Sequence, residues 1–291
     1  MATLSGVDPR AIIDPDARIG ADVEVGPWTI IGAEVEIGDG CRIASHVVIK
    51  GPTVMGRNNR IYQFSTIGED TPALAYGGEA TSLLIGDDNV FREGVTIHRG
   101  MIQDRGRTVI GSRCLLMAYV HVGHDCVLGD DVIMANNAAV SGHCTVGDHA
   151  NFGGYAGVPQ YRSIGAGAHI AGMSLVLKDV PAYMTVMGNP ASAIGLNLEG
   201  MRRRNYSKEV IGALREAHRV VYRKGLTVND ACAELEGLAA EHPEVAVFVD
   251  SIRDSQWGIV RPRKQAAADS EGADDSAGAE DSQGAAEDGE E

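Results

Sequence analysis

The chain has 291 residues, enough for one large domain and a smaller one. Aromatic residues make up only 5% of it and glycines number 37, a composition that argues against an ordinary mixed α/β core and favours many tight turns. The net charge is −15, but ten acidic residues and no basic ones lie in 265–291. The remainder is therefore only mildly acidic and lacks the basic character of a nucleic-acid-binding protein.

Several further classes of protein are disfavoured. No apolar stretch follows basic residues at the N-terminus, and no run approaches the ~20 apolar residues of a membrane span, so we expect neither a secretory signal nor a membrane span. The five cysteines form no Cys-x-x-Cys pair, which argues against zinc-ribbon and thioredoxin-like sites. We expect a cytoplasmic protein with reduced thiols and with no cofactor or metal.

An apolar residue recurs every six positions along most of the chain. The first run consists of Val7, Ile13, Ile19, Val25, Ile31, Ile37, Ile43, Ile49, Met55, Ile61 and Ile67. The phase returns at 85–97 and, shifted by one residue, continues from 110 to 176. The residue four further on is usually small, and four cysteines occupy that position: Cys41, Cys114, Cys126 and Cys144. We expect both positions to face the core, where free cysteines are common.

A six-residue period fits neither an α-helix nor an amphipathic strand, but it fits a coil with three short flat sides. Residues 18 apart then stack about 4.8 Å from each other on successive coils. The pattern resembles the hexapeptide repeat of the left-handed β-helix acyltransferases. That resemblance implies a mainly β fold, a left-handed parallel β-helix over 1–189, and assembly into a homotrimer.

Two segments interrupt the repeat, at about 69–84 and 99–109. We interpret both as loops, which on a rigid scaffold usually carry function. The repeat ends near Val180, and helical signals follow it.

The expected helices run over about 207–224, 227–241 and 243–255. Ser207 can cap the first, Thr227 with Asp230 resembles a capping box for the second, and Pro243 can open the third. The sequence predicts a small α-helical C-terminal domain over 190–262. An acidic tail over 263–291 follows. We expect it to be disordered, because it contains no apolar residue larger than Ala.

Three histidines and one aspartate fall at outward positions of the repeat, and these are His121, His124, Asp125 and His143. Asp125 and His143 are 18 residues apart and should stack. An imidazole beside a carboxylate can act as a general base, because the carboxylate sets its tautomer and basicity. Solvated histidines are one alternative. A zinc site like that of the γ-class carbonic anhydrases is another, but the His-x-x-His spacing here argues against it.

A more specific resemblance covers residues 1 to about 262. It rests on the motifs at Ser45–Lys50, Ile61–Ser65, Val95–Gly100, His121–Asp125, Ala135–Asn137, Asp179–Pro181, Gly188–Pro190 and Asn197–Arg204. With these motifs the chain resembles the UDP-N-acetylglucosamine O-acyltransferases of lipid A synthesis. The resemblance implies transfer of a hydroxyacyl chain from an acyl carrier protein to the 3-hydroxyl of a UDP-aminosugar.

The resemblance also implies roles for individual residues. His124 would be the general base, Asp125 would orient it, and the N–H of Gly142 would stabilise the oxyanion. The residues implied to contact substrate are His121, His143, Gln160, Asn197, Glu199, Arg203 and Arg204. The basic run Arg202–Arg204 would bind phosphates and the acidic acyl carrier protein, and Gly172, with Met173 beside it, matches the position that measures acyl length.

Three departures from the family pattern concern the acceptor. Ala73 and Ala75 stand where the family commonly has Asp and Lys, and Pro159 stands where it commonly has His. A homologous enzyme acting on another UDP-aminosugar, such as a 3-amino analogue, therefore stays open. A metalloenzyme and a non-catalytic scaffold are the alternatives from other classes.

Overall fold

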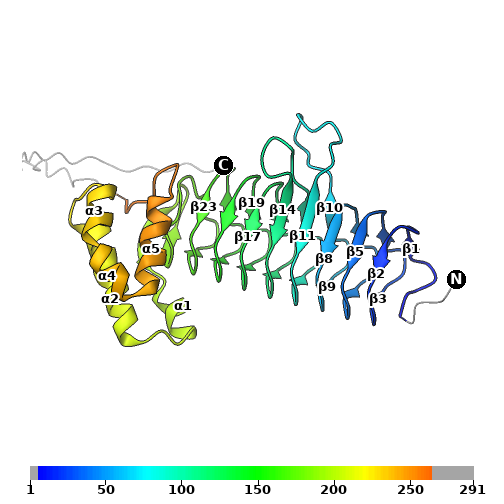
Figure 1. Cartoon of the computed structure of the whole chain (residues 1–291), viewed down its shortest axis with the longest axis horizontal. Helices are drawn as coiled ribbons and strands as arrows, with labels where there is room; N and C mark the ends of the chain where they lie inside the picture. Colours follow the sequence, from blue (N-terminus) through cyan, green and yellow to red (C-terminus); the bar gives the residue numbers. More distant parts are fainter. Residues whose placement is uncertain (1–5, 264–291) are drawn as a thin grey trace, which may run out of the picture.

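The computed structural model describes residues 6–263, which form a long solenoid with a helical unit at its C-terminal end (Figure 1). The solenoid is a left-handed parallel β-helix whose three sides are three sheets. This confirms the fold class expected from the hexapeptide repeat. The predicted acidic tail lies outside the described residues from 264 onward.

The first sheet has eight parallel strands: β1 (Ile12–Ile13), β4 (Ile30–Ile31), β7 (Val48–Ile49), β10 (Thr66–Glu69), β13 (Thr96–His98), β16 (His121–Val122), β19 (Ala139–Val140) and β22 (Gly157–Val158). The second also has eight: β2 (Arg18–Ile19), β5 (Val35–Ile37), β8 (Thr53–Met55), β11 (Ser82–Ile85), β14 (Arg107–Ile110), β17 (Val127–Leu128), β20 (Thr145–Val146) and β23 (Ser163–Ile164).

The third sheet has ten strands: β3 (Glu24–Val25), β6 (Arg42–Ile43), β9 (Arg60–Ile61), β12 (Val90–Phe91), β15 (Leu115–Leu116), β18 (Ile133–Met134), β21 (Asn151–Phe152), β24 (His169–Ile170), β25 (Met184–Met187) and β26 (Ser192–Leu196). Only its last strand, β26, runs antiparallel. The chain visits the sheets in turn, so each coil has three corners. Corner 1 leads from the third sheet to the first, corner 2 from the first to the second, and corner 3 from the second to the third.

The core confirms the inward positions read from the repeat. Ile31 pairs with Ile49, and Val122 with Val140, so identical positions stack coil upon coil. All five cysteines are free and buried. Because each inward aliphatic side chain packs on the one above it, the stack removes a continuous column of apolar surface from water.

The two interruptions are shorter than expected, because strands β10, β11 and β14 extend into the predicted loops. The loops themselves cover 70–81 and 99–106, and they project from the same edge of the solenoid (Figure 1). Inside the coils beside them, Asn59 and Asn89 are fully buried and hydrogen-bond the backbone of neighbouring coils, including Gly86 O and Gly111 O. This polar ladder was not anticipated from the sequence.

The C-terminal unit contains five helices: α1 (Leu198–Arg203), α2 (Lys208–Arg223), α3 (Val228–Glu234), α4 (Glu236–Glu241) and α5 (Pro243–Arg253). Ser207 and Thr227 cap α2 and α3 through their side chains, as the sequence predicts. Helix α5 contacts α2, α3 and α4. None of the helices in this described part of the chain has the length and apolarity that a membrane span requires.

Two predictions about this region were wrong in detail. We expected the helical domain from 190, but the hairpin β25–β26 extends the third sheet to Leu196. We also expected one helix over 227–241, but Leu235 ends α3 by donating its N–H to three carbonyls of that helix, and α4 follows. Gly237 lowers the helix propensity of this segment, which favours the break.

Candidate active site

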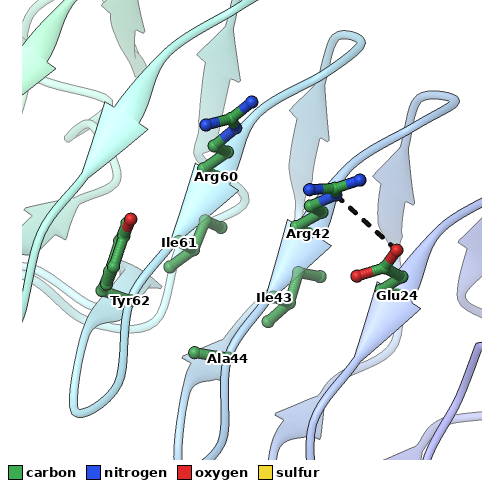
Figure 2. Close-up of a pocket in the computed structure, with 7 residues that line it drawn as sticks. All are labelled: Glu24, Arg42, Ile43, Ala44, Arg60, Ile61 and Tyr62. Atoms are coloured by element: carbon green, nitrogen blue, oxygen red, sulfur yellow. Dashed lines mark ion pairs between the residues drawn. The ribbon is translucent and has the colours of Figure 1, made fainter.

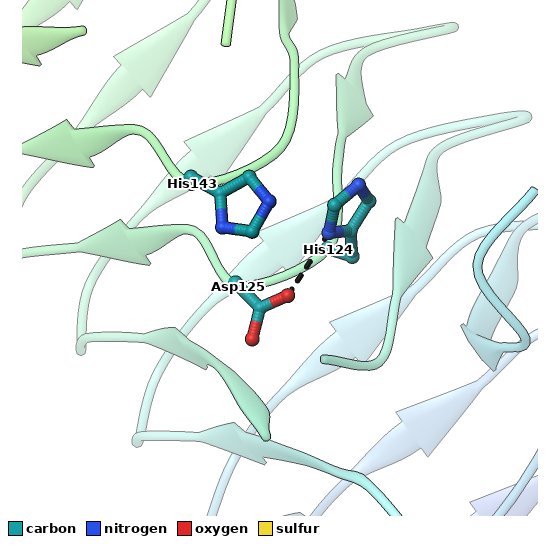
Figure 3. Close-up of side chains that lie close together, drawn as sticks. All are labelled: His124, Asp125 and His143. Atoms are coloured by element: carbon teal, nitrogen blue, oxygen red, sulfur yellow. Dashed lines mark hydrogen bonds and ion pairs between the residues drawn. The ribbon is translucent and has the colours of Figure 1, made fainter. Parts of the chain in front are cut away.

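Corner 2 holds the catalytic candidates on two successive coils. Asp125 lies between β16 and β17, and His143 lies one coil further, between β19 and β20. Both residues have positive φ, 56° and 64°, in the left-handed region that Asp and His tolerate better than most residues. Figure 3 shows the imidazoles of His124 and His143 and the carboxylate of Asp125 converging at this corner.

His124 and Asp125 form a buried hydrogen-bonded pair. The Nδ1 atom of His124 lies 2.9 Å from Oδ2 of Asp125. The side chains are 8% and 0% exposed. When Nδ1 carries the hydrogen, this bond leaves the lone pair on Nε2 free to accept a proton.

The loop 99–106 explains why these outward residues are buried. Met101 donates its backbone N–H to Asp125 Oδ2 at 2.9 Å. Arg105 donates to the carbonyl of Asp125 at 2.8 Å and reaches Thr145 Oγ1 at 3.3 Å. The chain thus covers His124 and Asp125 with its own loop.

The same loop supplies a second carboxylate–imidazole pair. Asp104 Oδ2 lies 2.6 Å from His143 Nδ1. The ring of His143 stacks on Tyr161, with centroids 4.3 Å apart and planes within 2°, and it meets His124 edge-on at 4.7 Å. His143 is therefore fixed on three sides. The corner contains two imidazoles, each paired with its own carboxylate.

Gly142 lies directly against the open nitrogen of the base. A Cβ placed on Gly142 would come within 2.5 Å of His124 Nε2. Any side chain here would therefore occupy the space in front of that nitrogen. The backbone N–H of Gly142 has no hydrogen-bond partner among the described residues, so it is available to a ligand.

His121 lies on β16 beside the pair, in contact with a histidine that the sequence reasoning missed. His121 Nδ1 is 2.8 Å from Thr96 Oγ1, and its ring meets His98 edge-on at 5.1 Å. Burial, with a smaller contribution from His121, lowers the pKa of His98 to about 4. Burial also lowers the pKa of His121. Both rings are therefore neutral hydrogen-bonding groups at pH 7.

A metal ion is the alternative occupant of this corner. His124, Asp125 and His143 offer ligand atoms within 4.8 Å of one another. However, Asp125 Oδ2 already accepts hydrogen bonds from Met101 and His124, and His143 Nδ1 faces Asp104. The two Nε2 atoms and Oδ1 of Asp125 remain, and this oxygen has no hydrogen-bond partner among the described residues. The same carboxylate holds the Nδ1 side of His124, which is the arrangement of a general base with its orienting group, so we interpret the corner as a site of proton transfer.

The four predicted contacts near α1 form a separate group. Asn197, Glu199, Arg203 and Arg204 line an open cavity of about 490 Å³ together with His149, Asn151 and His169, at corner 3 and on the third sheet. The carboxylate of Glu199 pairs with Arg203 at 3.0 Å. Two guanidinium nitrogens of Arg204, Nε and Nη2, are buried and have no hydrogen-bond partner in the part of the chain that the structure describes. An anion is the ligand that such a guanidinium requires.

Asn197 has a local structural role. Its Oδ1 accepts the N–H of Gly200 at 2.9 Å and so caps α1, and its Nδ2 donates to the carbonyl of Gly167 at 2.9 Å. Most of its hydrogen-bonding capacity is therefore already used in shaping the wall of this cavity.

On one chain, the cavity at corner 3 and the acid–base cluster at corner 2 lie on different edges. The structure thus brings His121, His124, Asp125, Gly142 and His143 together, but not the group around Arg204. Gln160 is exposed beside Tyr161 at corner 2. Met173 is 72% exposed at corner 1, next to Gly172.

The functional residues that sequence reasoning missed are His98, Asp104, Arg105 and Tyr161. One signal was present, because the break in the repeat marked 99–109 as a functional loop. Which of its side chains would reach corner 2 depends on the path of the loop, which no periodicity encodes.

A further hollow lies far from this chemistry, on the third sheet near the N-terminal end. It measures about 240 Å³, and Arg42 and Arg60 lie side by side along it, with Glu24 paired to Arg42 at 3.6 Å (Figure 2). No imidazole or thiol lines it. We call Arg42 and Arg60 the N-terminal arginine pair.

Comparison with known proteins gives matches over both parts of the chain. Residues 16–51 and 107–142 match the bacterial transferase hexapeptide (six repeats) family, and 179–260 match domain 2 of UDP N-acetylglucosamine O-acyltransferase. A curated protein from Stutzerimonas stutzeri is 59% identical over 258 residues, which cover 89% of this chain and 100% of that protein. A relative from Pseudomonas aeruginosa is 60% identical over the same shares. Both are named acyl-(acyl-carrier-protein)–UDP-N-acetylglucosamine O-acyltransferase.

Solved structures agree with these matches. The crystal structure of UDP-N-acetylglucosamine O-acyltransferase from Moraxella catarrhalis is 47% identical to this chain, with a TM-score of 0.87. The superposition covers 88% of this chain and 100% of that one. The similarity thus spans the solenoid and the helical unit together.

The depressed pKa of His98 predicts how stability responds to acid. The pKa of His98 is about 4 in the folded chain, against an ordinary value of 6.5. As the pH falls, the unfolded chain therefore binds a proton on this imidazole before the folded chain does. The stability contributed by neutral His98 is complete above pH 6.5 and is lost as the pH falls from 6.5 to about 4. In His98→Gln, the thermal midpoint should therefore fall less steeply over this window than in the wild type.

Scanning calorimetry at fixed protein concentration measures this difference. His46→Gln is the matched control, because His46 is an exposed histidine at corner 1. If His98→Gln and the wild type lost stability with the same slope between pH 6.5 and 4, the neutral state of His98 would be refuted.

Proposed function

This chain belongs to the UDP-N-acetylglucosamine O-acyltransferases, and we propose that it performs their reaction with His124 as the general base. It is an acyltransferase of the first step of lipid A biosynthesis, acting between an acyl carrier protein and UDP-N-acetylglucosamine. Within the proposal, the transferred group is an (R)-3-hydroxyacyl chain and the acceptor atom is the 3-hydroxyl oxygen of the sugar.

The observation that carries the proposal is the buried His124–Asp125 pair. Asp125 holds the Nδ1–H of His124, so Nε2 takes the proton of the sugar hydroxyl as its oxygen attacks the thioester carbonyl. The tetrahedral intermediate collapses to the ester. The released carrier thiolate then takes the proton back from the imidazolium, which returns the base to its starting state.

Gly142 contributes both space and a hydrogen-bond donor. The absence of a side chain leaves Nε2 of His124 accessible. Its unpartnered backbone N–H can stabilise the oxyanion that forms on the thioester carbonyl, a contribution of about 3–4 kcal/mol where such donors have been removed.

His143 lines the acceptor site in this proposal, with His121 and Gln160 beside it. The Asp104 carboxylate fixes the Nδ1–H tautomer of His143, so its Nε2 presents an acceptor to a sugar hydroxyl. Asp104 is thus a positioning residue that acts through His143.

Asn197, Glu199, Arg203 and Arg204 bind the nucleotide and donor phosphates in this proposal. The two unpartnered guanidinium nitrogens of Arg204 support it, because a phosphate would supply the missing acceptors. The acyl chain would lie against Gly172 and Met173, whose size and position set the length accommodated.

We infer a homotrimer, because these two groups are separated on one chain. If corner 2 of one copy faced the cavity at corner 3 of the next, base and phosphate ligands would share one cleft. Corner 1 supports such packing, because it carries an exposed apolar row. We call this row the aromatic edge; it consists of Trp28, Phe64, Tyr119, Tyr155 and Met173. An apolar strip of this length on one face marks an interaction surface.

We place the activity in the cytoplasm. The five free buried cysteines support this location, because thiols persist in reducing compartments.

Acyl transfer tests the central assignment. With a series of (R)-3-hydroxyacyl carrier proteins and UDP-N-acetylglucosamine, we expect the wild type to turn over and to show one preferred chain length. His124→Ala should lower kcat/KM by about 10²- to 10⁴-fold, the usual contribution of a general base. His242→Ala, at a half-buried histidine in the helical unit outside the site, should retain wild-type kcat/KM, and an active His124→Ala enzyme would refute the role of His124.

The acceptor is tested in the same assay with the 3-amino analogue of the sugar. Ala73 is half-buried and Ala75 is exposed in the loop 70–81, and neither offers a charged group to a sugar hydroxyl. A higher kcat/KM for the amine than for the alcohol would assign the chain to the other acceptor, with the His124 mechanism unchanged.

Asp104→Asn tests the positioning role. Removing the charge from the hydrogen bond to His143 should lower kcat/KM for UDP-N-acetylglucosamine by about 10- to 100-fold, equivalent to about 1.5–3 kcal/mol. Asp104→Glu should restore part of the loss. Gln103→Ala, at the exposed neighbour, is the matched control, and unchanged kinetics in Asp104→Asn would remove Asp104 from the mechanism.

Tyr119→Arg tests the trimer. Tyr119 is 66% exposed in the middle of the aromatic edge and covers Gly94 of the coil before it. A charge buried there between copies should shift the assembly to smaller species in sedimentation analysis, because an unpaired buried charge is costly. Val247→Arg, on the exposed face of α5, should leave the mass unchanged. A trimeric Tyr119→Arg protein would show that corner 1 is not the interface.

A further inference from the structure

A groove between α1 and α2 carries positive charge that the described chain does not neutralise. It measures about 320 Å³ and is lined by Leu198, Arg202, Lys208, Ile211 and Arg215. Lys208 and Arg215 form no ion pair within residues 6–263, and Arg202 approaches only Glu199, at 3.7 Å. Some other basic side chains of the helical unit are paired, as Arg219 is with Glu216 and Arg253 with Asp250, whereas Arg204 and Arg223 form no ion pair in the described part of the chain. We call these five residues the basic groove.

We propose that the acidic segment 265–291 binds in the basic groove of the same chain and competes there with the acyl carrier protein. The segment has ten acidic residues and no basic one. The groove offers three cations around the apolar side chains of Leu198 and Ile211. The proposal rests on the proposed function and on the expectation from the family resemblance that the acidic carrier binds the basic run Arg202–Arg204.

The start of the segment is held near the groove. Arg261 donates from Nη1 to the carbonyl of Val221 at 2.8 Å and lies over the ring of Tyr222. Along α2, Arg215 is about 9 Å and Lys208 about 20 Å from Val221, at 1.5 Å per residue. The first acidic residues, Asp269 and Glu271, follow Arg261 by eight and ten residues. For comparison, a flexible chain of ten residues would span about 16–19 Å on average.

The path from this start to the groove is also basic. Arg223, Arg219, Arg215 and Lys208 follow one another at spacings of four, four and seven along α2, which places them on one stripe of the helix. Arg219 is paired with Glu216, so Arg223, Arg215 and Lys208 are the members of this stripe that have no ion pair among the described residues.

Tethering makes even a weak contact effective. A short flexible linker gives an effective concentration on the order of 1 mM. A segment that binds in trans with a Kd of about 0.1–0.5 mM would then raise the KM for the carrier by about 3- to 10-fold. The effect should vanish at high salt, which screens exposed charges. The curated relatives align over their whole length to 89% of this chain, so the shared fold does not require the segment.

The first experiment uses the full chain with every Asp and Glu of 265–291 changed to Asn and Gln. At low ionic strength, the neutralised protein should show a 3- to 10-fold lower KM for acyl carrier protein, with kcat and the KM for UDP-N-acetylglucosamine unchanged. At about 0.5 M salt, the two proteins should converge. Equal carrier KM values at low salt would overturn the proposal.

The second experiment needs no enzyme activity and so separates this inference from the proposed function. A fluorescent peptide of residues 265–291 should bind the neutralised protein, and Lys208→Gln with Arg215→Gln should abolish that binding. The same two changes at the N-terminal arginine pair, Arg42→Gln with Arg60→Gln, should leave it intact (Figure 2). Peptide binding that persists without Lys208 and Arg215 would overturn the groove assignment. If the peptide bound through the groove but the protein had no transferase activity, the contact would be supported and the proposed function would be refuted.

Discussion

The constant register between coils is the constraint on which the rest of the structure depends. Inward aliphatic side chains stack on their equivalents one coil away, so a one-residue slip would turn every core residue outward. Residues at one corner must then stack as well. This is why Asp125, His143 and Tyr161 form a row at corner 2, although 36 residues separate the first from the last. The clustering of these side chains is in this sense a consequence of core packing.

Register alone does not make an active site, because a bare corner would leave its polar groups in water. The insertion 99–106 changes this. Its backbone and side chains bind Asp125 through Met101 and Arg105, and they bind His143 through Asp104. The loop returns to the second sheet at β14 without disturbing the pairing of β14 with β11 and β17. The rigid scaffold therefore fixes the positions of the imidazoles, and the loop fixes their hydrogen bonds and removes water from them.

The six-residue periodicity of the sequence predicts the features that the register between coils determines, and few others. The sheet positions, the buried cysteines and the stacking of Asp125 with His143 follow from counting in sixes. Helix caps such as Ser207 were readable because their signals are local. Three features could not be predicted from the sequence: the role of Asp104, the His98–His121 contact, and the internal ladder of Asn59 and Asn89. Each depends on where an insertion leaves and rejoins the solenoid. The break at Leu235 was missed because its one signal is Gly237, whose low helix propensity favours a break but which lies two residues further on, inside α4.

The separation of the acid–base cluster from the group around Arg204 fits the proposed function for a physical reason. A convex solenoid corner can present a base and an oxyanion donor, but it cannot surround a ligand as large as a nucleotide sugar. The opposing wall must come from another surface, and Arg204 has the required character, with two buried donors that no described residue satisfies. An isolated chain bears the cost of those unpaired donors without benefit. If corner 2 of one copy packed against corner 3 of another, a bound ligand would supply the acceptors that these donors lack. Assembly and substrate recognition would then depend on the same residues.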